Sequence, residues 1–498
     1  MKNFYLALAL KLATVCLLKA QTIDTVKQAY LAEIKTIGKQ FSSSFYRNYK
    51  TIYSRPEKEF IQLIDSSRTI FNHALQQYKG KLDAKFYQNQ KAEIKYYFDR
   101  LLIEYPLTHE IYADASPANR SKIPILLKAN EADFNKPELL TNTDFTSYFK
   151  AFIALKTSLE LRKGNYKNQD NQHFMVSWKT IQSYINNKKC LEYWQFDYLY
   201  NQIDNNGTKQ IDKYYKKFVS ATSDTLLVNK VKRLYDEDLA ALKNHIIKPY
   251  KKTGPFSLDI HVFVPDTLQY TGARPTIVFF HGGSWSEGKP DWFFSTCQSY
   301  AGKGWVACAV EYRTYGRHGT LPFEAVKDAR SAIRWVRKNA GTYHIDTSRV
   351  VATGNSAGGH LALSTALANN WNEKTDNLSV SPVPNALVIN AGVYDLTDDI
   401  TAWLRKDLPD KNQARSISPN FLVNKTLPPA LLFHGTNDMN VPFETARKFA
   451  KDMIAAGNTE IDFQPLEGGG HFIWFDRRFA DQMQKKRNEF YKKYGFEN

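Results

Sequence analysis

The feature that most constrains the fold is an alternation of short apolar runs and helical segments in the second half of the chain. Seven apolar runs occur, at 258–264, 276–280, 306–312, 350–353, 386–389, 430–433 and 461–465. Amphipathic segments with helical spacing lie between several of them, at 323–339, 358–368 and 443–456. Runs that are apolar along their whole length and alternate with helices predict a mostly parallel sheet covered on both faces. The first run instead alternates apolar and polar residues, as an antiparallel edge strand would.

The first half of the chain has a different texture. Gly and Pro are sparse there, and apolar residues recur at helical spacing in segments such as 25–38, 57–78, 92–103, 145–162, 178–187 and 228–245. The length of 498 residues also favours more than one folding unit. We therefore predict an all-helical domain over residues 21–245 and an α/β domain over residues 246–498. No motif in the helical domain assigns it a function.

The N-terminus predicts export. Lys2 precedes an apolar run, and Ala20 offers a cleavage point, so residues 1–20 read as a signal peptide and the expected location is secreted or periplasmic. Lys11 interrupts the run, which leaves an amphipathic first helix as the alternative. Lipid attachment at Cys16 is a third interpretation. No later stretch of the sequence is apolar for eighteen residues, so we expect no transmembrane segment after the signal.

Charge and cysteine content restrict the partners. The net charge of +17 is spread along the chain without a dense basic run, so we expect no nucleic-acid partner. Removing the signal leaves Cys190, Cys297 and Cys308, an odd number. Cys297 and Cys308 could pair, or they could be two small buried residues near a strand.

A nucleophile signature lies where one predicted strand passes into a helix. The segment Gly354-Asn355-Ser356-Ala357-Gly358 follows the run 350–353 and opens the helical stretch 358–368. Small residues two positions before and after the serine let the strand and helix backbones approach and allow a strained serine conformation. The start of the helix also places backbone N–H groups and a partial positive charge beside it. The pattern predicts Ser356 as a nucleophile.

A glycine-containing loop after an earlier strand predicts an oxyanion hole. His281-Gly282-Gly283-Ser284-Trp285 follows the run 276–280. Acyl transfer builds negative charge on a carbonyl oxygen, and glycine lets backbone amides point toward that charge. We expect the donors to be the N–H groups of Gly283 and Ser284, together with that of Ala357.

Two further residues follow the last two predicted strands. Asp438 lies in the loop after the run 430–433, and His471 follows three glycines after the run 461–465. A serine, an aspartate and a histidine that each follow a strand predict a triad in which His471 is the base and Asp438 orients it. Asp395, after the run 386–389, is the alternative acid.

Three other polar residues are expected to be structural. His281 would hold its loop rather than transfer protons, and His360 would pack behind the nucleophile. Asp328, in the helical segment 323–339, would pair with Arg330 or with a loop.

Residues 246–498 resemble the α/β-hydrolase superfamily, specifically its esterase branch with an HGGxW loop. That branch includes bifunctional feruloyl and acetylxylan esterase-like proteins and hormone-sensitive-lipase-like esterases. The matching segments are HGGSW at 281–285, EYR at 311–313, DARSAIRWV at 328–336, GNSAGGHLAL at 354–363, HGTNDMNVP at 434–442 and GGGH at 468–471. The resemblance implies ester hydrolysis by a serine, without a metal or another cofactor. Ser284 stands where many relatives carry a third glycine, and any residue supplies an N–H there.

These observations predict an exported serine esterase. By resemblance it would remove short acyl groups, acetyl or feruloyl, from a carbohydrate or a similar scaffold, so its partner would be a small-molecule or polysaccharide ester. Trp285 is the expected substrate contact, although Trp285 and Trp474 could equally be packing residues. Two alternatives stay open. One is an amidase or peptidase like the formamidases or prolyl peptidases, and the other is a binding or scaffold protein with an accessory hydrolase domain.

Overall fold

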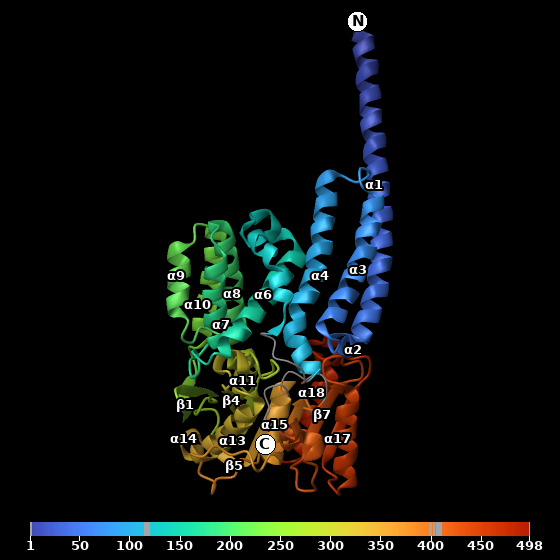
Figure 1. The fold of residues 1–498 in the computed structure, drawn as a ribbon. Helices are drawn as coiled ribbons and strands as arrows, with labels where there is room; N and C mark the ends of the chain where they lie inside the picture. Colours follow the sequence, from blue (N-terminus) through green and yellow to red (C-terminus); the bar gives the residue numbers. More distant parts are fainter. Residues whose placement is uncertain (1, 114–119, 398–400, 402–403, 405–410, 498) are drawn as a thin grey trace. The chain divides into compact units, whose positions relative to one another are not determined.

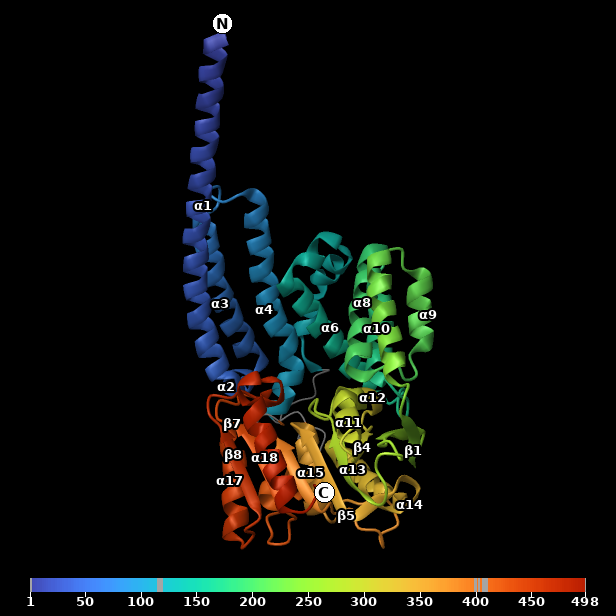
Figure 2. The same ribbon diagram turned by 180° about the vertical axis from the view of Figure 1, so that it is seen from behind.

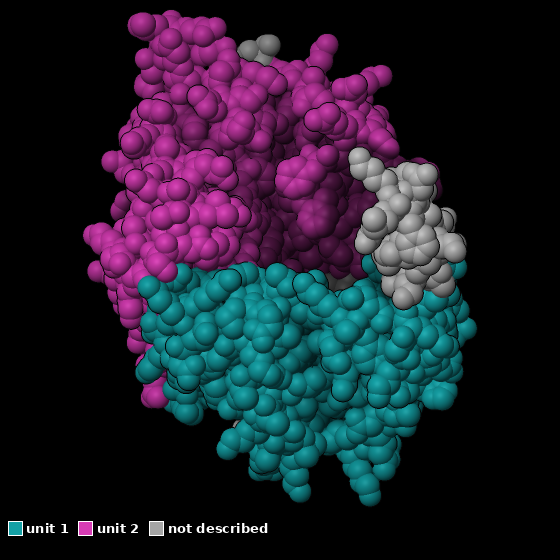
Figure 3. Space-filling model, turned by 90° about the horizontal axis from the view of Figure 1, so that it is seen from above, with its two compact units in different colours: residues 1–163, 177–194 teal, residues 164–176, 195–498 magenta. Residues whose placement is uncertain are grey.

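The computed structural model describes residues 2–113, 120–397, 401, 404 and 411–497, with side chains from Thr25 onward. The chain forms two compact units. The first comprises residues 1–163 and 177–194, and the second comprises residues 164–176 and 195–498. Figure 3 colours the two units separately.

The first unit is helical, as predicted. Its main helices are α1 (Lys2–Arg47), α2 (Tyr49–Tyr53), α3 (Glu57–Gln77), α4 (Ala84–Tyr112), α5 (Ile123–Leu126) and α6 (Thr143–Leu161) (Figure 1). Aromatic side chains form much of its core, because rings of Phe45, Tyr53, Phe60 and Tyr105 contact one another in sequence. The abundance of Tyr and Phe in this half of the sequence therefore serves packing.

The second unit includes helical segments that precede the sheet. Helices α7 (Gln172–Tyr184) and α8 (Lys188–Asn206) each contribute residues to both units, whereas α9 (Asp212–Ala221) and α10 (Thr225–Ala241) belong wholly to the second. The change from helices to strands falls at Ile246, where the sequence pattern changes. The compact units divide elsewhere, and the two predicted domains stay a prediction as folding units.

The sheet has eight strands in the order β1-β2-β4-β3-β5-β6-β7-β8. Neighbours from β4 to β8 are parallel, while β1–β2 and β2–β4 are antiparallel. The predicted fold class, a mostly parallel sheet with helices before it, is confirmed. The strand bounds are Ile246–Thr253 (β1), Phe256–Phe263 (β2), Arg274–Phe280 (β3), Val306–Val310 (β4), Ile345–Asn355 (β5), Ala386–Asn390 (β6), Ala430–Gly435 (β7) and Ile461–Leu466 (β8).

The prediction that the first apolar run is the sheet's edge was wrong. That run is β2, which is antiparallel as expected but lies between β1 and β4. The edge strand β1 carries Pro249 and three lysines, so its sequence reads as neither an apolar strand nor a helix. Its register shifts between Pro249 and Lys251, which is how an edge strand accommodates a proline.

Helices cover both faces of the sheet. Side chains from α13 (Pro322–Lys338), α15 (Ala357–Leu367) and α17 (Phe443–Ala455) pack on one face, and those from α11 (Phe294–Ala301) and α18 (Ala480–Lys493) pack on the other. Figures 1 and 2 show these helices around the sheet from opposite sides. Within the described part of the chain, no helix is both long and apolar enough to span a bilayer.

Candidate active site

Ser356 lies at a sharp turn between β5 and α15. Its backbone has φ 55° and ψ −122°, a conformation that residues with side chains rarely adopt. Its N–H donates to the carbonyl of Asn390 at 2.9 Å, which ties the turn to the end of β6. The N–H of Ala357 stands at the start of α15, where helical N–H groups lack an intrahelical acceptor. The strained turn therefore presents Ser356 together with a free helix N-terminus.

Two glycines make this turn possible. A Cβ at Gly358 would lie 1.9 Å from the carbonyl oxygen of Phe280, and a Cβ at Gly354 would lie 2.4 Å from the backbone of Gly358. Strand β3 and the start of α15 thus approach more closely than any side chain permits. The two small residues around Ser356 are required for packing as well as for the turn.

His471 and Asp438 are joined by a hydrogen bond. The Nδ1–H of His471 donates to Oδ2 of Asp438 at 2.8 Å, and the Asp438 carboxylate is wholly enclosed. The other oxygen, Oδ1, accepts the N–H groups of Asn440 and Val441, both at 2.8 Å. Burial alone would raise the pKa of Asp438, but hydrogen bonds from His434, His471 and the Val441 N–H lower it well below its usual value. Asp438 is therefore a carboxylate that can hold the His471 ring and stabilise its protonated form.

Sequence analysis missed the role of His434. Its Nε2 lies 3.2 Å from the Asp438 oxygen that receives His471, and 3.0 Å from the carbonyl oxygen of Val441. The side chain is fully buried between β7 and the loop that carries Asp438. The signal was present as the first residue of HGTNDMNVP, but a histidine four residues before an aspartate does not by itself reveal that the loop folds back.

The alternative acid, Asp395, lies in a different arrangement. Its Oδ1 accepts the N–H of Thr397 at 2.7 Å and the Thr397 hydroxyl at 2.6 Å, which closes a local turn after β6. The structure thus brings Asp438, not Asp395, to the ring of His471.

The loop predicted as an oxyanion hole follows β3 and turns through three successive left-handed residues. The φ angles are 101° at Gly283, 52° at Ser284 and 56° at Trp285. A Cβ at Gly283 would lie 2.2 Å from the carbonyl oxygen of Glu287, so only glycine fits there. The hydroxyl of Tyr312 supports the loop by donating to the carbonyl of His281 at 2.8 Å.

One cavity brings the predicted residues together. Its volume is about 310 Å³, and it is lined by Ser284, Trp285, Ser356, Val393, Thr401, Met439, Asn440, Val441 and His471. The predicted nucleophile, the predicted base, part of the predicted oxyanion loop and the predicted substrate contact Trp285 therefore line one cavity. Val393, Met439 and Val441 were not singled out in the sequence, because isolated apolar residues after strands carry no distinctive pattern.

The residues predicted to be structural are packed in the core. His281 stacks on Tyr312 with ring centroids 4.1 Å apart, and burial lowers its pKa to about 4. The Nε2 of His360 lies 2.7 Å from the carbonyl oxygen of Ile417, and burial lowers its pKa to about 4 as well. Both are held neutral near pH 7, as structural histidines would be.

Asp328 is buried and pairs with a loop, one of the two partners expected from sequence, rather than with Arg330. It pairs with Arg313 at 2.7 Å and with Lys251 at 2.6 Å, whereas Arg330 donates to the carbonyl of Thr365. Arg330 is only two positions along the helix from Asp328, so the two side chains point in different directions.

The two candidate disulfide partners are free thiols in the structure. Cys297 and Cys308 are both buried, on α11 and β4, and burial raises the pKa of Cys308 to about 12. The interpretation as two small buried residues is the one that the structure supports.

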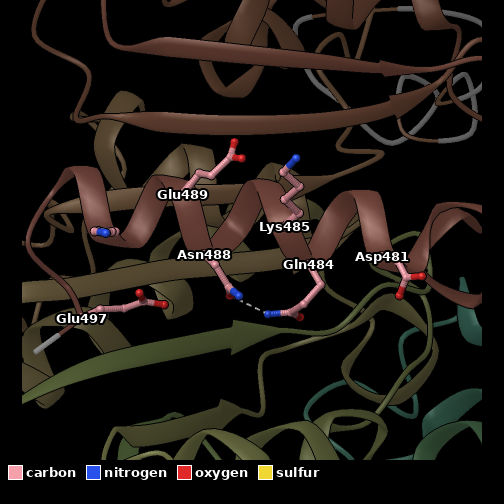
Figure 4. Close-up of a pocket in the computed structure, with 7 residues that line it drawn as sticks. Asp481, Gln484, Lys485, Asn488, Glu489 and Glu497 are labelled. Carbon is pink, nitrogen blue, oxygen red and sulfur yellow. Dashed lines mark hydrogen bonds between the residues drawn. The ribbon is translucent and has the colours of Figure 1, made fainter.

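A second hollow lies along α18 and has no such chemistry. It is lined by Asp481, Gln484, Lys485, Asn488, Glu489, Lys492 and Glu497, and Gln484 donates to Asn488 across its floor (Figure 4). Its lining mixes both signs of charge and contains no nucleophile with a base beside it.

Known proteins resemble the second unit. The family model BD-FAE matches residues 258–453. The chain is 27% identical over 223 residues to Esterase LipC of Mycobacterium tuberculosis, covering 40% of this chain and 53% of that protein. It is also 27% identical over 244 residues to the probable isoprenylcysteine alpha-carbonyl methylesterase ICMEL1 of Arabidopsis thaliana, covering 42% of this chain and 50% of that protein. The chain thus spans about half the length of these curated relatives.

Among solved structures, the chain is similar to a thermophilic esterase, Est2, of Thermogutta terrifontis. The propionate-bound form is 35% identical with a TM-score of 0.47, covering 51% of this chain and 96% of that chain.

Proposed function

The C-terminal part of this chain belongs to the esterase branch of the α/β-hydrolases, and from that premise we propose that the protein hydrolyses carboxylic esters with Ser356, His471 and Asp438. The observation that carries the proposal is that Ser356 and His471 line one cavity, while His471 is bound to the enclosed carboxylate of Asp438. A nucleophile, a base and an oriented acid are the three groups that acyl transfer through a serine requires.

The reaction proceeds in two halves. The Ser356 hydroxyl attacks the ester carbonyl while His471 takes its proton, and the negative charge on the carbonyl oxygen is met by the N–H groups of Gly283, Ser284 and Ala357. His471 then returns the proton to the departing alkoxide, which leaves as the alcohol and leaves an acyl group on Ser356. Water adds to this acyl group by the same base, releasing the carboxylic acid and restoring the hydroxyl.

The apolar lining of the cavity favours a short acyl group as the part of the substrate bound next to Ser356. Apolar side chains of Trp285, Val393 and Val441 lie in the same lining as Ser356, and an acyl chain buried against them would be held by apolar contact. The Trp285 side chain is itself buried at 2% exposure, so it forms a wall rather than a mobile flap. Acetyl or feruloyl esters of a carbohydrate or similar scaffold are the substrates we propose from the resemblance in sequence.

The test is a panel of nitrophenyl esters from acetate upward, run with acetylated xylan, a feruloyl sugar ester and a peptide amide. We expect turnover of short esters and little turnover of the amide. Ser356→Ala should lower ester turnover by several orders of magnitude, because loss of a triad member does so elsewhere. Asp452→Asn, on the surface of α17, is the matched control. Ester turnover by Ser356→Ala within tenfold of the unchanged protein would overturn the assignment.

Export remains part of the proposal. Its support is the Lys2 start and the apolar run before Ala20. Expression of the full chain in a Gram-negative host, with cell fractionation and N-terminal sequencing, tests it. A mature protein that begins near Gln21 in the periplasm or medium is expected, whereas an uncut N-terminus in the cytosol would contradict export.

A further inference from the structure

The oxyanion loop is strained and must be held from outside. Ser284 and Trp285 both carry side chains at φ values near +55°, a region where a Cβ crowds its own backbone. Such conformations persist only where the surrounding structure determines them. The elements that are hydrogen-bonded to this loop therefore control the position of its N–H donors.

Three backbone hydrogen bonds connect the loop to neighbouring segments. On one side, the N–H of Tyr315 donates to the carbonyl of Trp285 at 2.8 Å, and the N–H of Gly316 donates to the carbonyl of Ser286 at 2.9 Å. These donors belong to the short helix α12 (Tyr315–His318). On the other side, the N–H of Gly288 donates to the carbonyl of Asn205 in α8 at 2.9 Å. Two separate segments thus hold the two ends of the turn.

The α12 segment, which binds the loop on the first side, is held in place by a buried arginine. Arg317, next to Gly316, donates to both carboxylate oxygens of Asp170 at 2.9 and 2.6 Å and to Glu311 at 2.6 Å. The other oxygen of Glu311 accepts Lys209 at 2.8 Å. The side chains of Arg317, Asp170 and Glu311 are each no more than 7% exposed. Asp170 belongs to the segment 164–176, far from α12 in sequence, and a planar two-point pair of this kind fixes orientation as well as position.

The contact on the second side, between Gly288 and α8, is held in place by a buried lysine. Lys289, next to Gly288, donates to Asp238 of α10 at 2.6 Å, and these side chains are 12% and 7% exposed. Asp238 also accepts the N–H and the hydroxyl of Thr208 at 3.0 and 2.7 Å. The neighbouring backbone is closely packed, because a Cβ at Gly288 would lie 2.2 Å from the ring of His281.

We propose that the ion pairs Asp170–Arg317 and Asp238–Lys289 are positioning elements of the oxyanion loop, so that the hydrolase depends on residues 164–176 and 195–241 for its rate. Neither pair contacts substrate. Each acts by holding the backbone segment that binds the strained turn. Removing Asp170 leaves Arg317 with Glu311 alone, and removing Asp238 leaves Lys289 with Asp291 alone, so the buried cation loses one of its two carboxylate partners. The kinetic consequence rests on the proposed function, whereas the effect on the loop does not.

The test uses the full chain with Asp170→Asn or Asp238→Asn. The matched control is Asp452→Asn, at a half-buried aspartate that pairs with Lys448 on α17, away from the loop. Loss of a whole oxyanion donor lowers kcat by about 10²–10³, so a displaced donor should lower kcat by about tenfold to a hundredfold. The KM should change little, because ground-state binding does not use the donors. The pH profile of kcat/KM should keep its midpoint, because the His471–Asp438 pair is untouched. Amide hydrogen exchange should accelerate in the peptide spanning 282–289 and stay unchanged around His471.

The outcomes separate this inference from the proposed function. If the unchanged protein hydrolyses no ester, the proposed function fails, and the exchange rates at 282–289 still decide the inference. Folded variants with unchanged kcat and unchanged exchange there would overturn it. So would a loss of rate accompanied by a shifted pH profile, since that would place the damage at the base.

A milder variant covers the case in which Asp238→Asn does not fold. Thr208→Val removes one hydrogen bond to Asp238 while keeping its pair with Lys289. We expect it to raise exchange at 282–289 and to lower kcat by a smaller factor than Asp238→Asn. Unchanged amide exchange at 282–289 in Thr208→Val would count against a positioning role for the Asp238–Lys289 pair.

Discussion

Four buried histidines should make the second unit unstable in mild acid. Burial lowers the pKa of His261, His281, His318 and His360 to about 4. An unfolded histidine titrates near 6.5. Between these two pKa values the histidines are protonated in the unfolded chain but neutral in the folded chain. The free energy of unfolding therefore falls as the pH drops from 6.5 toward 4.

The expected loss is large compared with the stability of a domain. A change from pH 7 to pH 5 should cost about 1.8 kcal/mol for each such histidine, or about 7 kcal/mol for four, by proton linkage. Typical domains are stable by only about 5–15 kcal/mol, so marked destabilisation near pH 5 is expected. Carboxylates with lowered pKa, such as Asp438, add their loss at still lower pH.

His360 offers a specific test. Its Nε2–H can donate to Ile417, while its Nδ1 is buried and has no hydrogen-bond partner in the described structure. A protonated ring would therefore bury an unpaired N–H as well as a charge. In His360→Gln the side-chain amide can still donate, but nothing titrates at this position.

The assay is urea unfolding followed by tryptophan fluorescence at several pH values from 7 to 5. Glu287, whose pKa burial raises, works in the opposite direction, so the difference between variants is the measured quantity. His360→Gln should reduce the slope of unfolding free energy against pH, averaged between pH 7 and pH 5, by about 0.9 kcal/mol per pH unit. His73→Gln, at an exposed position on α3, is the matched control and should keep the full slope. A slope unchanged by His360→Gln would refute the reasoning.

Three further predictions concern the site. Asp438→Asn should lower kcat on nitrophenyl acetate by about 10⁴, and Asp395→Asn should lower it far less, because only Asp438 is bound to the base; the reverse ranking would assign the acid to Asp395. Gly358→Ala should give no soluble active protein, because the added Cβ would lie 1.9 Å from the carbonyl oxygen of Phe280; a soluble yield and activity matching the unchanged protein would contradict this. Ser284→Gly should retain kcat, because the N–H remains and glycine accepts its φ of 52°; a loss beyond tenfold would show that the hydroxyl takes part.

The fold was predictable where a short segment carried its own signal. All seven apolar runs are strands of the sheet. The central ones are buried on both faces and must be apolar along their length, whereas β2 carries an alternating pattern and β8 is a partly exposed edge strand. The strand β1 was missed, since an edge strand is exposed and its lysines and Pro249 resemble a loop. The turn around Ser356 was predictable for a similar reason, because the pattern Gly354-Asn355-Ser356-Ala357-Gly358 lies in one short segment between a strand and a helix.

Long-range partners were not predictable in the same way. Asp328 was expected to pair with Arg330 or with a loop; it binds Arg313 of the loop after β4 and Lys251 of β1, and the sequence pattern named neither residue. A sequence shows which side chains are charged, but the partner of a buried charge depends on which elements meet in the core.

The amino-acid sequence by itself determined the strand–helix alternation and the positions of Ser356, Asp438 and His471, because these depend on residue types and spacings within single segments. Only the tertiary structure decided that Asp438 rather than Asp395 contacts His471, that His434 lies beside the Asp438 carboxylate, and that Asp170 and Asp238 pair with Arg317 and Lys289. Each of those contacts joins residues from different elements, or across a loop that folds back. Their pairing is set by strand order and by the close approach of backbones, neither of which is written in any one stretch of the chain.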